Sequence, residues 1–251
     1  MNAKIWTAGL AVIGDGILSG RTQDRNIAQV ATWLNVQGIR LAEVRVVPDI
    51  EERIVAAIEA LRSAYDYCFT TGGIGPTHDD ITVDAVAAAL GVPVVVHPQA
   101  RSILERYYSD KGGLNEGRLR MARVPEGAEL IENRRSGAPG IRLGNLFLMA
   151  GVPHITAGML DSLTGQLEGG RPLVSVTVGA FAPESEVAEL LREAEAATDG
   201  VAIGSYPFFK EGRVGSNFVV RSEEEALART VADELAGRLA EAGYEPVDGG
   251  I

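Results

Sequence analysis

The sequence predicts an α/β fold, in which a mostly parallel sheet with helices on both faces is followed by a small α+β domain of ferredoxin-like character. As far as residue 167, apolar runs typical of strands alternate with amphipathic segments typical of helices, which implies right-handed crossovers between parallel strands. After Gly169-Gly170-Arg171-Pro172 the order changes to strand, helix, strand, strand, helix. We therefore expect one domain over residues 1–169 and a second over residues 170–251.

Each element of the first domain has a local signal. Strands are expected at apolar runs bounded by Gly, Pro or Asp, namely 5–13, 39–47, 67–71, 92–96 and 146–149. Helices are expected where apolar residues recur at helical spacing, namely after Asp24, after Asp49, and over 82–90, 99–108, 116–122 and 153–167. Asp24 and Thr82 are expected to cap their helices, and Asp49 with Glu52 has capping-box spacing. The stretch 125–144 is rich in Gly, Pro and Arg and is expected to be an extended excursion.

The second domain shows the same kinds of signal over shorter distances. Strands are expected at 173–179, 201–203 and 214–221, and helices at 184–196 and 223–242. Between two of these strands, Tyr206-Pro207-Phe208-Phe209 is expected to be an exposed apolar turn. It would serve either to pack this domain or as an oligomer contact.

Composition excludes several classes of partner. The formal net charge of −11 argues against nucleic acid, because such binding depends on Lys and Arg that neutralise phosphates. Residues 1–170 carry 16 basic and 19 acidic side chains and residues 171–251 carry 7 and 15, so a small anionic ligand is reasonable in the first domain. No run approaches the roughly 20 apolar residues of a membrane-spanning helix, and we expect neither a signal peptide nor a membrane partner. The single cysteine, Cys68, lies in a predicted strand, which fits a cytoplasmic location.

Three loops should meet at the carboxyl edge of the parallel sheet, where open α/β sheets bind ligands. They are 14–26, 48–49 and the glycine-rich stretch 70–82, TTGGIGPTHDDIT. Glycines in the third loop allow backbone N–H groups to approach a ligand and permit positive φ. The helix that follows directs free N–H groups and a positive dipole end toward the same space, which is a natural anion site.

Four carboxylates accompany these loops, those of Asp15, Asp49, Asp79 and Asp80. They would repel a phosphate unless a divalent cation lies between, or unless one of them acts as a base. Glycine and aspartate together therefore indicate a metal–phosphate site. A structural interpretation stays open, in which Asp49 only caps its helix while Asp79 and Asp80 only complement a helix dipole.

Four motifs together resemble the molybdopterin-binding domain family: IGDGILSGRTQDRN (13–26), TTGGIGPTHDDIT (70–82), PEGAELIENRRSGAPGIRL (125–143) and AGVP (150–153). The resemblance within that family is to the N-terminal domain of competence/damage-inducible protein A and to the similar domain of eukaryotic FAD synthase. IGSYPFF (203–209) and GSNFVVR (215–221) resemble the small domain that follows there. This resemblance implies a three-layer α/β fold that binds molybdopterin or a nucleotide, and domains that commonly self-associate, so we expect a homo-oligomer.

The resemblance also implies roles for individual residues. It assigns a phosphate loop to Thr71, Gly72, Gly73, Gly75, Pro76 and Thr77, and further ligand contacts to Asp15, Ser19, Asp24 and Asn26. Catalytic roles fall on Asp80 and Asp49, and metal binding on Asp80 and Asp79. The implied cofactor is Mg²⁺ or another divalent cation.

Two functions stay open. One is metal-dependent cleavage of a nucleotide pyrophosphate such as ADP-ribose or FAD, as the resemblance implies for some relatives, and the Asp79-Asp80 pair favours it. The other is a non-catalytic pterin- or nucleotide-binding module linked to molybdenum cofactor biosynthesis. Gly16 stands where many relatives carry Glu, and this departure favours the module.

Overall fold

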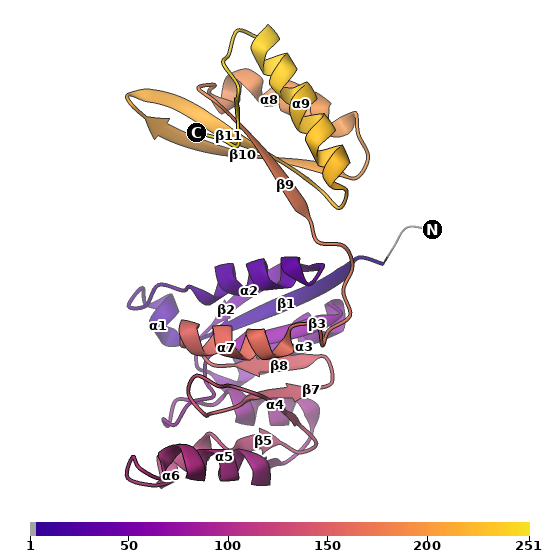
Figure 1. Ribbon diagram of the computed structural model, residues 1–251. Coiled ribbons are helices and arrows are strands. Elements are labelled where there is room, and N and C mark those ends of the chain that lie inside the picture. Colours follow the sequence, from indigo (N-terminus) through magenta and orange to yellow (C-terminus); the bar gives the residue numbers. More distant parts are fainter. Residues whose placement is uncertain (1–3) are drawn as a thin grey trace. The chain divides into compact units, whose positions relative to one another are not determined.

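The computed structural model describes residues 4–251, which form two compact units that divide between Gly170 and Arg171 (Figure 1). Each unit has its own apolar core. Within the described residues, no helix combines the length and the apolar character needed to cross a membrane.

The first unit is built around one six-stranded sheet. Its first half comprises β1 Trp6–Ile13, α1 Asp15–Leu18, α2 Asn26–Val36, β2 Ile39–Val47, α3 Glu51–Ala64, β3 Tyr67–Thr71 and α4 Thr82–Leu90. Its second half comprises β4 Val94–Val96, α5 Pro98–Tyr108, α6 Glu116–Arg120, β5 Arg123–Pro125, β6 Glu129–Ile131, β7 Gly140–Leu143, β8 Leu146–Met149 and α7 Pro153–Leu163. The sheet order is β2-β1-β3-β8-β7-β6. The first four strands pair in parallel, and β7 and β6 are added by antiparallel pairing.

Helices cover both faces of this sheet because successive strand residues point to opposite sides. Ile13 packs into the core formed with α3 and α4, whereas its neighbour Val12 packs into the core formed with α2 and α7. The same alternation separates Leu148 from Phe147 in β8. The predicted three-layer, mostly parallel α/β fold is therefore confirmed.

The strand order fixes where this fold can bind a ligand. Strand β1 lies between β2 and β3, and the helices that follow β1 and β3, α2 and α4, pack on opposite faces. Chains that leave β1 and β3 thus diverge at the carboxyl ends of these strands and leave a crevice between them. This topological switch point falls at Ile13-Gly14 and Thr71-Gly72.

The second unit is a small α+β domain. Its elements are β9 Val174–Ala180, α8 Glu184–Ala196, β10 Val201–Lys210, β11 Arg213–Ser222, α9 Glu225–Glu241 and β12 Val247–Asp248. The strands pair antiparallel in the order β10-β11-β9-β12, and α8 and α9 pack on one face through a core that includes Val178, Val187, Phe218 and Leu235. This βαββαβ arrangement confirms the predicted ferredoxin-like domain.

Two predicted connections are in fact strands. Residues 125–144 do not form an extended excursion, because they contain β6 and β7, which complete the main sheet. The stretch Tyr206–Phe209 is not a turn, because it lies within the ten-residue strand β10, and the turn falls at Glu211-Gly212. Both of these turn residues have positive φ, as a two-residue hairpin turn of type I′ requires. Pro207 misled the prediction because proline is tolerated in an edge strand such as β10.

Candidate functional site

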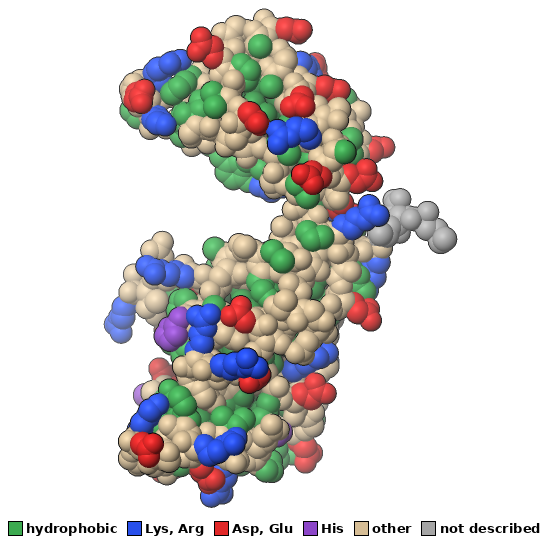
Figure 2. Space-filling model, viewed as in Figure 1, with side chains coloured by type: hydrophobic (Ala, Val, Ile, Leu, Met, Phe, Trp, Pro, Cys, Tyr) green, Lys and Arg blue, Asp and Glu red, His purple; other side chains and the backbone are tan. Residues whose placement is uncertain are grey.

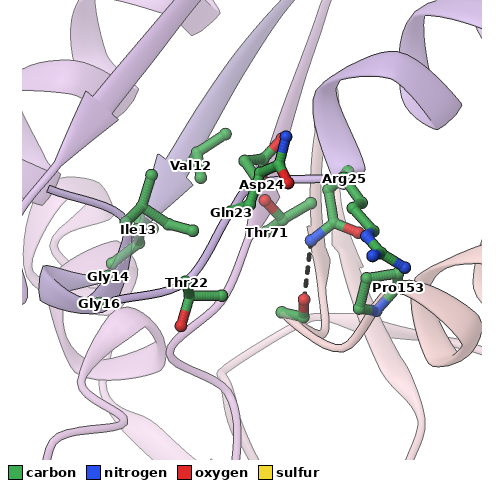
Figure 3. A pocket seen from close by; sticks show the side chains of 13 residues that line it. Val12, Ile13, Gly14, Gly16, Thr22, Gln23, Asp24, Arg25, Thr71 and Pro153 are labelled. Atoms are coloured by element: carbon green, nitrogen blue, oxygen red, sulfur yellow. Dashed lines mark hydrogen bonds between the residues drawn. The ribbon is translucent and has the colours of Figure 1, made fainter. Parts of the chain in front are cut away.

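A cavity of about 210 Å³ lies at the switch point between the ends of β1 and β3. The start of α2 and the turn before α7 form its remaining walls (Figure 3). Its lining combines apolar strand ends with polar loop side chains: Val12, Ile13, Gly14, Gly16, Ile17, Thr22, Gln23, Asp24, Arg25, Asn26, Thr71, Gly151 and Pro153. Of the predicted ligand contacts, Asp24, Asn26 and Thr71 line this cavity.

Asp24 and Asn26 hold the loop after β1 against the rest of the site. An Asp24 carboxylate oxygen accepts a hydrogen bond from the Ile27 N–H at 2.8 Å, in the first turn of α2. Asn26 is buried, and its side-chain Nδ2 donates to the Gly151 carbonyl at 2.8 Å, the contact that is dashed in Figure 3. Gln29 Nε2 bridges Asn26 Oδ1 at 2.9 Å and the Pro153 carbonyl at 3.1 Å. Two of the sequence motifs, 13–26 and 150–153, are thereby brought together.

Thr71 presents an unsatisfied hydroxyl at this cavity. The residue is 1% exposed, and its Oγ1 has no hydrogen-bond partner. It lies two residues after Phe69 in β3, so it points to the face that carries α2 and α7. Nearly all buried polar groups in proteins are hydrogen-bonded, and each exception needs an explanation. A ligand in the cavity supplies one.

The glycine-rich loop packs closely on the chain itself. Gly72 and Gly73 have φ of 97° and 69°. A Cβ on Gly72 would lie 2.2 Å from the Ile13 carbonyl oxygen, and one on Gly73 would lie 2.1 Å from Thr82 Oγ1. Thr82 does not cap α4 as predicted: it is the first helical residue, and its buried hydroxyl donates to the Gly72 carbonyl at 2.9 Å. These glycines are therefore required by the packing of the loop.

The tip of this loop is held by Asp80. Its carboxylate accepts a hydrogen bond from the Thr77 N–H at 2.8 Å and another from the Thr77 hydroxyl. A Cβ on Gly75 would lie 2.7 Å from one Asp80 carboxylate oxygen. From α6, Arg120 donates to the Asp80 carbonyl at 3.2 Å, and Gly117 packs against the Pro76 carbonyl. None of the residues from Gly72 to Thr77 lines the cavity.

Asp49 links the second loop to the first. It does not cap α3 as its spacing to Glu52 predicts, because the N-cap is Ile50 and makes no side-chain capping bond. Instead, Asp49 Oδ2 accepts a hydrogen bond from the Asp15 N–H at 2.9 Å. Burial raises the pKa of the Asp49 carboxyl above its ordinary value, the Asp15 N–H lowers it in part, and the charges of Asp15, Asp79 and Asp80 raise it further.

The charges of Asp15, Asp79 and Asp80 act on Asp49, but the four side chains do not form a preformed metal site. Within residues 4–251, no three His, Cys, Asp or Glu side chains are placed to bind one metal ion. Asp15 and Asp79 are exposed, as is Ser19, whose hydroxyl donates to the Gly16 carbonyl at 3.3 Å. Mg²⁺ in proteins is commonly bound by one or two carboxylates together with ligand phosphates and water. The donor set fits that mode of binding and does not fit a site made by protein ligands alone.

Three further cavity residues with polar or charged side chains, Thr22, Gln23 and Arg25, are absent from the predicted contacts. They lie within the predicted loop, but no motif distinguishes them from its other polar side chains. Their position just before α2, beside the switch point, is the signal that could have identified them.

Comparison with known proteins places the chain in a family. A model of a probable molybdopterin binding domain matches residues 9–169. The chain belongs to this molybdopterin-binding domain family. A model of the FAD synthase middle domain matches residues 172–248. The predicted family resemblance is therefore confirmed for both units.

Relatives share most of this chain. A protein of Aeropyrum pernix is 34% identical over 242 residues, which cover 92% of this chain and 89% of the relative. A CinA-like protein of Desulfosudis oleivorans is 34% identical and a probable FAD synthase of Caenorhabditis briggsae is 29% identical; they cover 92% and 93% of this chain, which spans 57% and 50% of their own lengths. The crystal structure of the protein CinA from Thermoplasma acidophilum matches with a TM-score of 0.60 and 29% identity, covering 64% of this chain and 96% of that chain.

Proposed function

We propose that this protein binds a small phosphate-containing ligand, a pterin or a nucleotide, in the cavity where β1 and β3 end. The observation that carries the proposal is the buried, unpartnered hydroxyl of Thr71 at the wall of that cavity. Membership of the molybdopterin-binding domain family supports the class of ligand.

The cavity offers two kinds of polar group. The start of α2 brings a positive dipole end to one wall, and Arg25 adds a cationic side chain, so a phosphate is favoured there. Asp24 and Gln23 provide acceptor oxygens, which suit the N–H groups of a pterin or base or the hydroxyls of a ribose. Thr71 can donate to either part of the ligand.

The test removes this hydroxyl while keeping the shape of the side chain. Binding of AMP, ADP, ADP-ribose and FAD would be measured by isothermal titration calorimetry for the wild type and for Thr71→Val. We expect at least one ligand to bind, and the variant to bind it about 3- to 10-fold more weakly, as the loss of one hydrogen bond predicts. Stability without ligand should not fall, because the lost hydroxyl has no partner in the protein.

Thr70→Val is the matched control. The Thr70 hydroxyl is also buried and unpartnered, but this residue is on the opposite face of β3 and does not line the cavity. Its ligand affinity should therefore equal that of the wild type. Equal affinities for all three proteins would reject Thr71 as a ligand contact, and no binding of any ligand would reject the proposed function for this ligand set.

Metal-dependent cleavage of a nucleotide diphosphate, of the ADP-ribose or FAD class, is a second candidate function. What favours it is the position of Asp49, which accepts the Asp15 N–H at 2.9 Å at the carboxyl edge of the sheet. Burial and the charges of Asp15, Asp79 and Asp80 raise its pKa, which suits a carboxyl that accepts a proton from water. Asp80 would hold a divalent ion together with the ligand's phosphates, with Asp79 as a further candidate, and Asp49 would act as the base. The bound ion would supply charge neutralisation at the phosphate groups.

Hydrolysis of ADP-ribose, FAD and NAD would be followed with Mg²⁺, Mn²⁺ or Co²⁺ present. Asp80→Asn should abolish a metal-dependent activity, and Asp49→Asn should lower it and remove the acidic limb of its pH profile, where protonation of Asp49 reduces activity. Binding without turnover by a folded protein would instead support the non-catalytic module linked to molybdenum cofactor biosynthesis.

A further inference from the structure

A groove between helices α2 and α7 adjoins the cavity. It has a volume of about 560 Å³ and follows α2 from Arg25 to Trp33 and α7 from Ala157 to Asp161. Arg25 also lines the cavity, so the two hollows meet at this side chain. Figure 2 shows this face of the first unit, where hydrophobic side chains over α2 and α7 are flanked by charged ones. We call this hollow the α2–α7 groove.

The cavity alone cannot enclose a ligand that has two ring systems. Its volume is about 210 Å³, whereas sites that enclose a ligand of drug size measure about 300–1,000 Å³. A dinucleotide such as FAD or NAD, in which a diphosphate joins two nucleotide halves, must therefore extend beyond the cavity. The α2–α7 groove begins at the cavity wall and offers the space for the second half.

The floor of the groove is apolar and is held in place. It is formed by two residues of each helix, Ala28, Trp33, Ala157 and Leu160. The Trp33 ring packs edge-to-face on Phe69 with centroids 6.2 Å apart, and its Nε1–H donates to the Thr164 hydroxyl at 3.1 Å. An indole fixed in this way loses little conformational freedom when a flat ring system packs against it. Because positions 28 and 157 are alanines, no long side chain fills the space between the helices.

Two charged side chains of opposite sign indicate which part of a ligand lies where. Arg25 has no ion-pair partner within residues 4–251, so its guanidinium is available to a diphosphate. The other charged residue of the groove, Asp161, accepts a hydrogen bond from Arg135 at 3.2 Å, and its side chain is 68% exposed. A phosphate placed beside Asp161 would meet a like charge, whereas an uncharged sugar or ring would not. The diphosphate is therefore expected at Arg25, where the groove and the cavity meet.

Gln29 presents an unused acceptor at the same end of the groove. Its Nε2 donates to Asn26 Oδ1 at 2.9 Å and to the Pro153 carbonyl at 3.1 Å. Since Asn26 and Pro153 line the cavity, these bonds hold the amide between the two hollows. Gln29 Oε1 accepts no hydrogen bond from the described residues, so a sugar hydroxyl or a ring N–H can donate to it.

We propose that the α2–α7 groove is a subsite for the second half of a dinucleotide, whose first half occupies the cavity and whose diphosphate lies at Arg25. This inference rests on the proposed function of the cavity and adds a class of ligand, namely two planar ring systems joined through a diphosphate. At a rise of about 1.5 Å per residue, Arg25 and Trp33 are about 12 Å apart along α2, which accommodates a sugar and a ring.

Ala28→Phe fills the groove and tests this subsite. Ala28 is exposed on α2, so the added ring occupies the groove and not the core. Val36→Phe is the matched control, because Val36 is 64% exposed on the same helix and does not line the groove. Isothermal titration calorimetry on the full chain would measure the binding of AMP, ADP, FAD and NAD to the wild type and to both variants.

The wild type should bind FAD and NAD at least tenfold more tightly than ADP, because only they carry a second ring system. Ala28→Phe should remove this difference and leave the affinities for AMP and ADP unchanged, which also shows that the variant is folded. Val36→Phe should match the wild type for all four ligands. Trp33 supplies a separate signal: in Trp6→Phe it is the one remaining tryptophan, and NAD should quench its emission by stacking while AMP should not.

Three results would overturn the subsite: FAD and NAD bind no more tightly than ADP, Ala28→Phe binds them as the wild type does, or Ala28→Phe weakens AMP as much as FAD and NAD. If AMP and ADP bind to the wild type in these cases, the proposed function of the cavity stands and only the groove is rejected. If none of the four ligands binds, the proposed function is rejected for these ligands as well.

Discussion

The cavity lined by Thr71 and the glycine-rich loop over residues 72–77 lie at the same edge of the sheet, yet their polar groups differ in whether they have a partner within the protein. In the loop, the Gly72 N–H bonds to the Met149 carbonyl and the Thr77 N–H bonds to Asp80. In the cavity, the Thr71 hydroxyl is buried and unpaired. The loop satisfies these hydrogen-bond donors within the protein, whereas the neighbouring wall of the cavity carries a hydroxyl group without a partner. Glycine content alone thus marks the position of a site, but not which of its atoms meet the ligand.

The largest expected effect is a loss of stability when alanine replaces a glycine. It should be larger where packing leaves no room for a Cβ than where only the positive φ favours glycine. Gly73→Ala would place a Cβ 2.1 Å from Thr82 Oγ1 at a φ of 69°, whereas Gly20, with a φ of 71°, has nothing within 4 Å of its Cβ position. Gly73→Ala should lower the free energy of unfolding by about 3 kcal/mol or more, and Gly20→Ala by about 1 kcal/mol. Urea denaturation measures both, and equal losses would show that the loop is not held by the Thr82 contact.

A smaller loss of stability is expected when the hydrogen bond from Asn26, at the start of α2, to the Gly151 carbonyl, before α7, is removed. Asn26→Ala removes the bond to the Gly151 carbonyl and leaves Gln29 without one acceptor. The free energy of unfolding should fall by about 2 kcal/mol, since a buried polar group loses its partner. Ligand affinity should fall with it, because the start of α2 is no longer fixed to the turn before α7. Calorimetry that showed unchanged ligand affinity would separate this hydrogen bond from the binding site.

The smallest expected effect on stability comes from the charge of the Asp49 carboxylate. The pKa of Asp49 is raised in the folded protein, so this group stabilises the fold when protonated, and that contribution is lost as pH rises above 3.8 and through the raised folded value. Asp49→Asn keeps an oxygen to accept the Asp15 N–H and removes the charge. The variant should therefore be slightly more stable than the wild type at pH 7, because the partly exposed charge is screened by solvent, and should lose this advantage below pH 3.8. A variant less stable than the wild type at pH 7 would contradict the burial of this carboxylate among like charges.

The sequence predicted the long elements well because each had a clear period. Strand β2 and helix α8 occupy the residues expected for them. Strands β6, β7 and β12 were missed or misread, since two to four residues are too few to show alternation. Asp49 was misassigned for a different reason: local spacing favours a cap, but the side chain bonds to Asp15, a residue 34 positions away.

The edge of the sheet that holds the cavity was predictable from the sequence, whereas most of the residues that line the cavity were not. The parallel pairing of the strands follows from the alternating elements, and with it the edge at which three loops meet. Whether the Thr71 hydroxyl is satisfied depends on where α2 and α7 place their polar atoms, which no local pattern encodes. The same holds for Thr77, whose donors are used by Asp80 only because the loop folds back on itself.

Chemical-shift mapping of backbone amides during titration with ADP-ribose or FAD tests the central comparison most directly. The account predicts that the largest shifts fall on Thr71 and on residues 22–26, while Thr77 at the tip of the glycine-rich loop changes little. Shifts concentrated on residues 73–77 with none at Thr71 would contradict it, because the glycine-rich loop and not the cavity would then hold the ligand.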